Sequence, residues 1–172
     1  MTIDRNIDLA ADFVRNSLSL NAPVTLDELR KAIRERLNGR CNPRNNDELG
    51  VDAEIITSCE SEYNFEINYL SERPTTRILF SISHELGHLF LHLLEEDGNL
   101  RKDATYQRNM TGTRQEYEAN EFAAAFLMPE DIFISKCREY MEKNRVNITK
   151  VADYFRVSVQ AATVRGNVLD LW

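Results

Sequence analysis

The sequence is poor in the residues that build a zinc ribbon or a disulfide framework. Its three cysteines, Cys41, Cys59 and Cys137, lie far apart and never form a C-x-x-C pair. Reduced thiols in a cytoplasmic protein are therefore expected. The sequence also lacks an apolar run near the roughly 20 residues of a membrane span, and its first residues do not have the shape of a signal peptide. We expect a cytoplasmic protein with no membrane partner.

Positive charge is scarce as well. Lysine and arginine number 21 against 28 aspartates and glutamates, which gives a formal net charge of −7. Such a balance argues against broad binding to nucleic acid phosphates, so we do not expect direct DNA binding. The length of 172 residues, with 42% hydrophobic residues, fits one domain, 1–172, with a core of its own.

Histidine is rare, but all three histidines of the chain lie in one segment. His84-Glu85-Leu86-Gly87-His88 reads H-E-x-x-H. On a helix, residues four apart share a face, so both imidazoles can reach one metal ion. Glu85 is rotated from His84 by about 100°, so it can stand beside the ion and take a proton from water. The pattern predicts a metal site with Glu85 as general base.

A chance match on an ordinary surface helix is the alternative, and the surrounding residues argue against it. Apolar residues fall on the side of the helix away from the two histidines, at Leu79, Ile82, Leu86, Phe90, Leu93 and Leu94. The helix therefore has an apolar back to bury and a polar front to present. Gly87 costs helix stability, about 1 kcal/mol against alanine, which suggests that another backbone passes close by.

A catalytic zinc needs a third protein ligand, and His92 is a poor candidate for that position. Three histidines on a straight helix span about 12 Å, which is too far to close one site. His92 is expected to support a ligand, face the substrate or simply pack. Glu116 and Asn120, on a helix expected over 113–128, share a face, so Glu116 could bind the metal and Asn120 could hydrogen-bond a ligand histidine.

Two other interpretations of this helix remain open. Thr113-x-x-Glu116 is also a capping box, so Glu116 might only close its own helix. Glu118 is the substitute ligand, although the helical period rotates it and Glu121 away from the face of Glu116.

The rest of the chain is predicted mainly helical. Two helices fill the N-terminal segment 1–40, the second with a Thr25-x-x-Glu28 capping box. A polar loop over 41–50 and two strands, 51–58 and 63–70, lead into the metal helix, 74–94. A loop over 95–114 follows, then the helix 113–128 and another over 129–143. Two short helices close the chain in the C-terminal segment 145–172, which is helix-turn-helix-like. The predicted fold is therefore α+β, with a small antiparallel sheet beside the H-E-x-x-H helix.

Two segments together carry a family resemblance. They are His84-Glu85-Leu86-Gly87-His88-Leu89-Phe90-Leu91-His92 and Glu116-Tyr117-Glu118-Ala119-Asn120-Glu121-Phe122-Ala123-Ala124-Ala125-Phe126-Leu127-Met128-Pro129. In this order they resemble the ImmA/IrrE family of zinc metallopeptidases over a catalytic core of about 50–130. The resemblance implies a zincin-like domain with a glutamate ligand and one Zn²⁺ per chain, with Mn²⁺ as the alternative. It also implies a regulatory protease whose substrate is a helix-turn-helix repressor encoded nearby, in bacteria or phage.

The expected chemistry is metal-assisted peptide hydrolysis, with zinc held by His84, His88 and Glu116. A donor to the developing oxyanion is also needed, and Tyr106, Arg114 and Tyr117 are the candidates.

Two rival functions remain. The first is a DNA-binding regulator, although the second helix of the C-terminal segment offers few base-reading side chains beyond Gln160, Thr163 and Arg165. The second is a partner protein of the toxin–antitoxin type that keeps a metallopeptidase fold. The intact Glu85 argues against lost chemistry.

Overall fold

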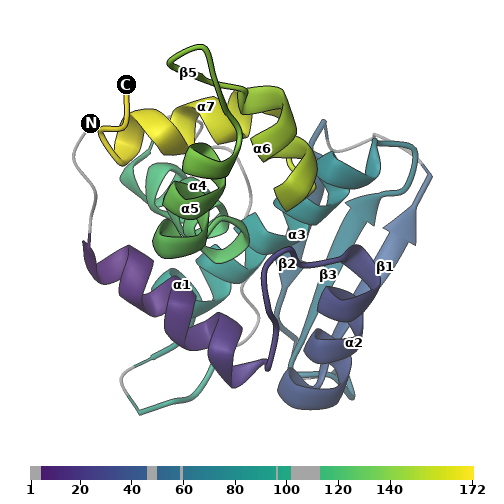
Figure 1. Ribbon diagram of the computed structural model, residues 1–172. Coiled ribbons are helices and arrows are strands. Elements are labelled where there is room, and N and C mark those ends of the chain that lie inside the picture. Colours follow the sequence, from purple (N-terminus) through teal and green to yellow (C-terminus); the bar gives the residue numbers. More distant parts are fainter. Residues whose placement is uncertain (1–4, 46–49, 59, 96, 102–112) are drawn as a thin grey trace.

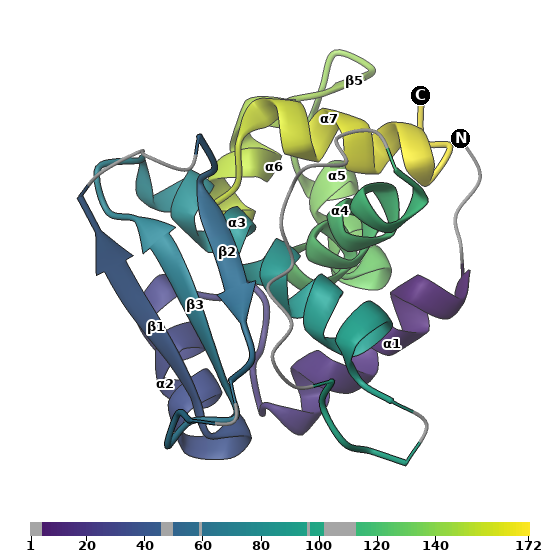
Figure 2. The same ribbon diagram turned by 180° about the vertical axis from the view of Figure 1, so that it is seen from behind.

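The fold is α+β and mostly helical, as predicted. The computed structural model describes residues 5–45, 50–58, 60–95, 97–101 and 113–172. The larger sheet has three strands, and Figures 1 and 2 show it on one side with a group of helices on the other. Helix α3 (Thr75–His88) lies between these two parts and contacts both the sheet and helix α4 (Arg114–Leu127).

The two N-terminal helices are α1 (Arg5–Ser17) and α2 (Leu26–Leu37). α1 buries one stripe of its surface and packs against α4. α2 begins with the capping box that the sequence predicts: the Glu28 amide donates to the Thr25 hydroxyl at 3.3 Å, and the Thr25 amide donates to the Glu28 carboxylate at 3.0 Å. Asn38 ends the helix in the left-handed conformation with φ 49°. Capping therefore fixes both ends of α2.

The sheet has the order β1-β3-β2, with β1 at Gly39–Arg44, β2 at Ala53–Ile56 and β3 at Phe65–Leu70. β2 and β3 are antiparallel, as predicted, but β1 pairs parallel with β3. The sheet is therefore mixed, and the prediction of a loop from residue 41 was wrong. β1 is a polar edge strand that contains Pro43, so it has no hydrophobic alternation, and pairing with β3 outweighs its weak propensity.

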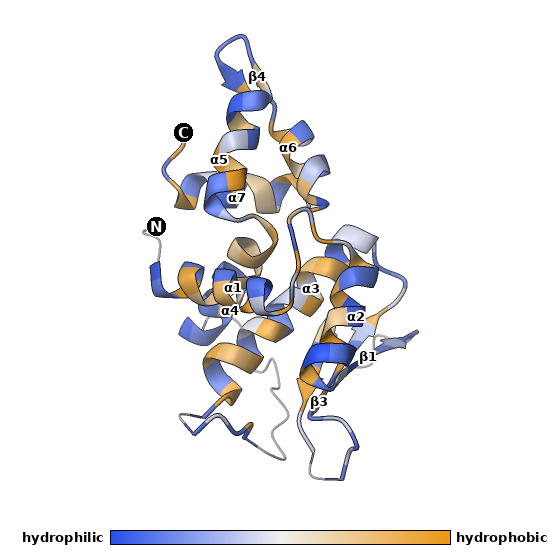
Figure 3. Cartoon of the chain, turned by 60° about the horizontal axis from the view of Figure 1, so that its bottom comes forward, coloured by the Kyte–Doolittle hydropathy of each residue, from blue (hydrophilic) through white to orange (hydrophobic). Residues whose placement is uncertain are grey.

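The sheet is covered by helices whose inner sides are hydrophobic. α2 packs on β1, and α3 packs on β2 and β3. In Figure 3, α2 turns a hydrophilic outer side toward the viewer. None of the helices in the described ranges is both long enough and apolar enough to cross a bilayer.

The C-terminal quarter folds as α5 (Glu130–Glu139), a short hairpin, α6 (Ile148–Phe155) and α7 (Val159–Val168). The hairpin pairs β4 (Met141–Glu142) with β5 (Arg145–Val146). The predicted helix to residue 143 was therefore too long. Lys143 and Asn144 have φ values of 48° and 62°, so the chain reverses where the sequence suggested another helical turn. The two short helices after it are where the sequence predicts them.

Two of the three cysteines lie in the described residues, Cys41 in β1 and Cys137 in α5, and both are free. Burial raises the pKa of Cys41 to about 12 and also raises the pKa of Cys137. Both thiols therefore stay protonated at neutral pH, where a thiol is a poor nucleophile and a poor metal ligand.

Arg165 joins α7 to both α1 and the end of α4. Its side chain is 1% exposed and donates two hydrogen bonds to the carboxylate of Asp8, at 3.0 and 2.8 Å. A third bond runs from its Nε to the carbonyl of Met128 at 3.1 Å. This ion pair holds the N-terminal and C-terminal helices together.

We expect Arg165→Met to lower the free energy of unfolding by about 3 kcal/mol, because it leaves the carboxylate of Asp8 without its cation. Urea denaturation followed by circular dichroism measures the change. Combining it with Asp8→Leu should recover part of the loss, since the unpaired charge is then gone. A loss near zero in the single variant would contradict the assigned ion pair.

Candidate metal centre

Helix α3 presents the H-E-x-x-H residues to another helix instead of to solvent. Its apolar side, with Leu79, Ile82 and Leu86, is fully buried. The polar side is buried as well, since His84, Glu85 and His88 are each no more than 2% exposed. The cover is α4, which packs along α3. The polar front that the sequence predicts is therefore an interface between two helices.

Gly87 is a point of close contact between α3 and α4. A Cβ atom at this position would lie 2.9 Å from the Cα of Ala119 and 3.1 Å from its carbonyl oxygen. Any larger residue would push the two helices apart. The glycine and the alanine together let α4 bring its side chains to the histidines, which is the close backbone contact that the sequence suggests.

The side chains of His84, His88 and Glu116 meet in this interface. The Nε2 atoms of the two histidines are 3.0 Å apart. The carboxylate of Glu116 lies 3.4 Å from Nε2 of His84 and 3.2 Å from Nε2 of His88. Among the described residues, this is the one group of histidine, cysteine or carboxylate side chains found close enough to hold a metal ion.

The spacing of these atoms fits a zinc ion. A tetrahedral zinc with bonds of roughly 2.0–2.1 Å has ligand atoms about 3.3 Å apart. The three measured separations, 3.0, 3.2 and 3.4 Å, lie on both sides of that value. Two imidazoles and one carboxylate are also a ligand set of catalytic zinc sites. The residues present therefore fit the metal.

Glu116 also belongs to the start of its own helix. Its amide donates to the hydroxyl of Thr113 at 3.4 Å, which is half of the capping box seen in the sequence. Its carboxylate reaches the two histidines. Helix capping and a role as metal ligand are therefore compatible at this position.

Asn120 orients His84. Its Oδ1 lies 3.0 Å from Nδ1 of His84. An amide oxygen only accepts, so Nδ1 of His84 carries the proton and its Nε2 keeps a lone pair. That lone pair is directed at the cluster, as a metal ligand requires.

His92 and Glu118 lie beside His88. His92 belongs to the π-helical turn η1 (Leu89–Leu93), which continues α3 and is closed by a hydrogen bond from the Leu94 amide to the Leu89 carbonyl, 2.9 Å. Glu118 lies outside the cluster of His84, His88 and Glu116, and its carboxylate is 3.1 Å from Nε2 of His92. A π turn holds more residues than an α turn, so the 3.6-residue period does not place the side chains after His88.

Glu118 is held ionised at neutral pH. Burial acts to raise its pKa, but hydrogen bonds from Arg114 and from His92 outweigh that effect and lower the pKa below its ordinary value. The Arg114 bond is short, 2.6 Å from Nε to the carboxylate.

The sequence offers three candidate oxyanion donors, and two of them, Arg114 and Tyr117, lie in the described residues. Tyr106 lies outside the described residues. Arg114 is 87% exposed and donates to Glu118. Tyr117 is 55% exposed and faces a groove next to the cluster. The oxyanion donor therefore stays unassigned.

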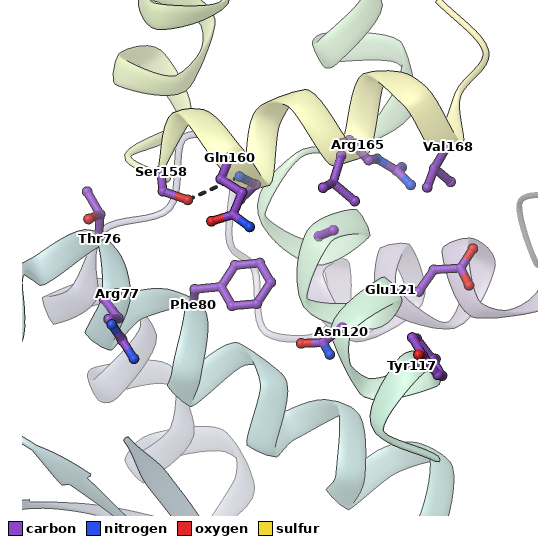
Figure 4. A pocket seen from close by; sticks show the side chains of 13 residues that line it. Thr76, Arg77, Phe80, Tyr117, Asn120, Glu121, Ser158, Gln160, Arg165 and Val168 are labelled. Atoms are coloured by element: carbon purple, nitrogen blue, oxygen red, sulfur yellow. Dashed lines mark hydrogen bonds between the residues drawn. The ribbon is translucent and has the colours of Figure 1, made fainter. Parts of the chain in front are cut away.

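The groove beside Tyr117 lies between α3, α4 and α7, and Figure 4 shows its lining. Its volume is about 660 Å³. Asn120 belongs both to this groove and to the His84 hydrogen bond. The apolar lining comes from Phe80, Ala124, Ala161, Val164 and Val168. Sequence reasoning missed the groove because its walls come from helices far apart in the chain.

A helix carrying H-E-x-x-H, packed against a second helix that supplies a glutamate, defines a domain of the metallopeptidase type. The chain belongs to the Peptidase_M78 family, the IrrE N-terminal-like domain, which matches residues 41–167. Members of this family are generally zinc-dependent.

Solved structures share this fold, and one of them is similar to almost the whole of this chain. It is a Mycobacterium tuberculosis transcriptional regulator, with a TM-score of 0.69 and 18% sequence identity. The match covers 98% of this chain and 48% of the regulator, so this chain spans about half of that protein. A search of curated protein sequences gives no match.

Proposed function

We propose that this chain is a zinc-dependent, site-specific endopeptidase that cleaves a helix-turn-helix repressor and so releases transcription. The cluster of His84, His88 and Glu116, with Glu85 next to the first ligand, is the observation that supports it. One Zn²⁺ per chain is proposed, with Mn²⁺ as the alternative metal. The repressor as substrate is proposed from the family resemblance.

The proposed mechanism assigns each residue one task. When bound, zinc supplies a Lewis acid that lowers the pKa of a water toward about 7 and polarises the substrate carbonyl. Glu85 takes the proton of that water and delivers it to the leaving amine. Asn120 keeps the His84 ring in the orientation that turns its Nε2 to the cluster.

Two surfaces near the cluster suit an extended peptide. β2 packs on α3 and, among the described residues, pairs with no strand other than β3. Its outer edge can accept main-chain hydrogen bonds from a peptide. The groove at Asn120 offers an apolar lining for side chains.

The test is co-expression of the chain with the helix-turn-helix repressor encoded nearest to it, followed by mass spectrometry of the repressor. A single discrete cut supports the proposal when it appears on co-expression and when a zinc chelator prevents it in a mixture of two lysates that were prepared separately. An intact repressor in cells that contain the folded, zinc-loaded protein would show that this repressor is not the substrate.

The DNA-binding rival depends on three side chains of α7, and two of them, Thr163 and Arg165, have hydrogen-bond partners within the protein. Arg165 is buried and paired with Asp8. The hydroxyl of Thr163 donates to the Val159 carbonyl at 2.8 Å, and Gln160 lines the groove. α7 therefore has little left for reading bases.

We accordingly expect no sequence-specific DNA binding at physiological salt. Fluorescence anisotropy with DNA from the protein's own operon measures it, and an unrelated duplex of equal length is the control. Binding in the nanomolar range that prefers the operon sequence and survives added salt would restore the rival.

A further inference from the structure

A chain of hydrogen-bonded side chains runs from the side of His88 that faces away from Glu116. Nδ1 of His88 lies 3.0 Å from Nδ1 of His92, and Nε2 of His92 lies 3.1 Å from the carboxylate of Glu118. Arg114 completes the chain at 2.6 Å from the other oxygen of that carboxylate. The side chains of His92 and Glu118 are 5% and 22% exposed, so the contact is largely shielded from water.

We propose that His92 and Glu118 are positioning residues, which fix the tautomer of His88 so that its Nε2 lone pair points at the metal. The proposal rests on the proposed zinc site. The proposal adds two residues to that site, His92 from η1 and Glu118 from α4, and it gives the π-helical turn after His88 a role.

The direction of each hydrogen bond in this series follows from its last pair, Arg114 and Glu118. A guanidinium only donates, and an ionised carboxylate only accepts. Nε2 of His92 must therefore carry a proton in order to bond to Glu118. In the neutral ring its Nδ1 is then an acceptor, so Nδ1 of His88 must be the donor. The remaining nitrogen of His88, Nε2, keeps its lone pair, and this atom lies 3.2 Å from Glu116.

The tautomer of His84, with its proton on Nδ1, is fixed by a single hydrogen bond. The oxygen of Asn120 accepts directly from its Nδ1. His88 has a neutral ring as its partner, and a neutral ring can either donate or accept at Nδ1. Glu118 removes that ambiguity because it needs the proton of His92 at Nε2. The carboxylate is therefore as important to the arrangement as the histidine itself.

Histidine nitrogen NMR of the zinc-loaded protein tests the tautomers directly. In long-range ¹H–¹⁵N spectra, we expect the proton of His92 on Nε2 and the proton of His88 on Nδ1. Finding the proton of His92 on Nδ1 would overturn the proposal.

Zinc affinity tests the consequence, measured by competition with a chromophoric chelator. His92→Leu should weaken zinc binding by roughly 10–100-fold, the usual effect of removing a partner behind a ligand. His92→Asn should recover much of the affinity, because its side-chain oxygen can accept near the place of Nδ1. Glu118→Gln should also weaken binding, while Glu130→Gln, at an exposed position in α5, serves as the matched control.

Two further readouts separate positioning from general damage. The absorption spectrum of the cobalt-substituted protein should change in His92→Leu, and the thermal midpoint of the metal-free protein should not. Unchanged affinity and spectrum in both His92→Leu and Glu118→Gln would overturn the proposal. The proposal would also be overturned if each variant that loses zinc affinity showed a matching fall in the thermal midpoint of the metal-free protein. If the wild type binds zinc but cleaves nothing, the peptidase proposal fails and this one stands; if it binds no zinc, both fail.

Discussion

Glu85→Gln is expected to keep its fold and its zinc and to lose cleavage of the repressor. Glutamine has nearly the shape of glutamate but cannot accept the proton of the attacking water. Glu85 is also absent from the group of His84, His88 and Glu116, so the ligands remain intact. Loss of a general base typically costs on the order of 10²–10⁴ in rate. Cleavage rates from single-turnover reactions, with zinc content measured on the same samples, give the result.

Glu72→Gln is the matched control, because it makes the same chemical change at an exposed position just before α3. It should cleave as fast as the wild type. Cleavage that persists in purified Glu85→Gln, with a contaminating protease excluded, would contradict the mechanism. A Glu85→Gln protein that still relieves repression in cells would favour the rival in which the chain acts as a binding partner.

The parts of the fold that follow from local sequence signals were predictable. The H-E-x-x-H segment is helical because its apolar residues recur with the helical period. Thr25 and Glu28 set the start of α2 through groups that are close in the sequence. The helical face shared by Glu116 and Asn120 also needs only the 3.6-residue period, and the structure brings both side chains to the histidines.

The parts that depend on distant contacts were not predictable in the same way. β1 is a strand because β3 pairs with it, and its own residues include Pro43. The contact of Glu118 with His92 depends on the π-helical turn. The spacing of apolar residues in the sequence does not predict such a turn. The groove at Asn120 requires α7 to lie beside α3 and α4. Each of these features is set by packing between elements.

The metal itself is tested by comparing two glutamates of one helix. Wild-type protein should purify with about one zinc per chain, whereas His84→Ala, His88→Ala and Glu116→Ala should lose it. Glu116 lies within 3.4 Å of both histidine Nε2 atoms, so its removal leaves two ligands and a weak site. Glu118 contacts His92 and not the cluster, so Glu118→Ala should keep most of its zinc after mild purification and show only the roughly 10–100-fold lower affinity of a lost supporting contact.

Metal analysis by mass spectrometry, with circular dichroism to confirm folding, decides whether Glu116 or Glu118 is the third ligand. Because the two variants remove the same side chain two positions apart on α4, general effects on the helix should be similar in both. Equal zinc content in the wild type, His84→Ala and His88→Ala would show that these histidines do not bind the metal. The reverse order, with zinc kept in Glu116→Ala and lost in Glu118→Ala, would make Glu118 the ligand and would require a rotation of α4 against α3. Such a rotation would conflict with the close contact between Gly87 and Ala119, because that contact fixes which face of α4 meets the histidines.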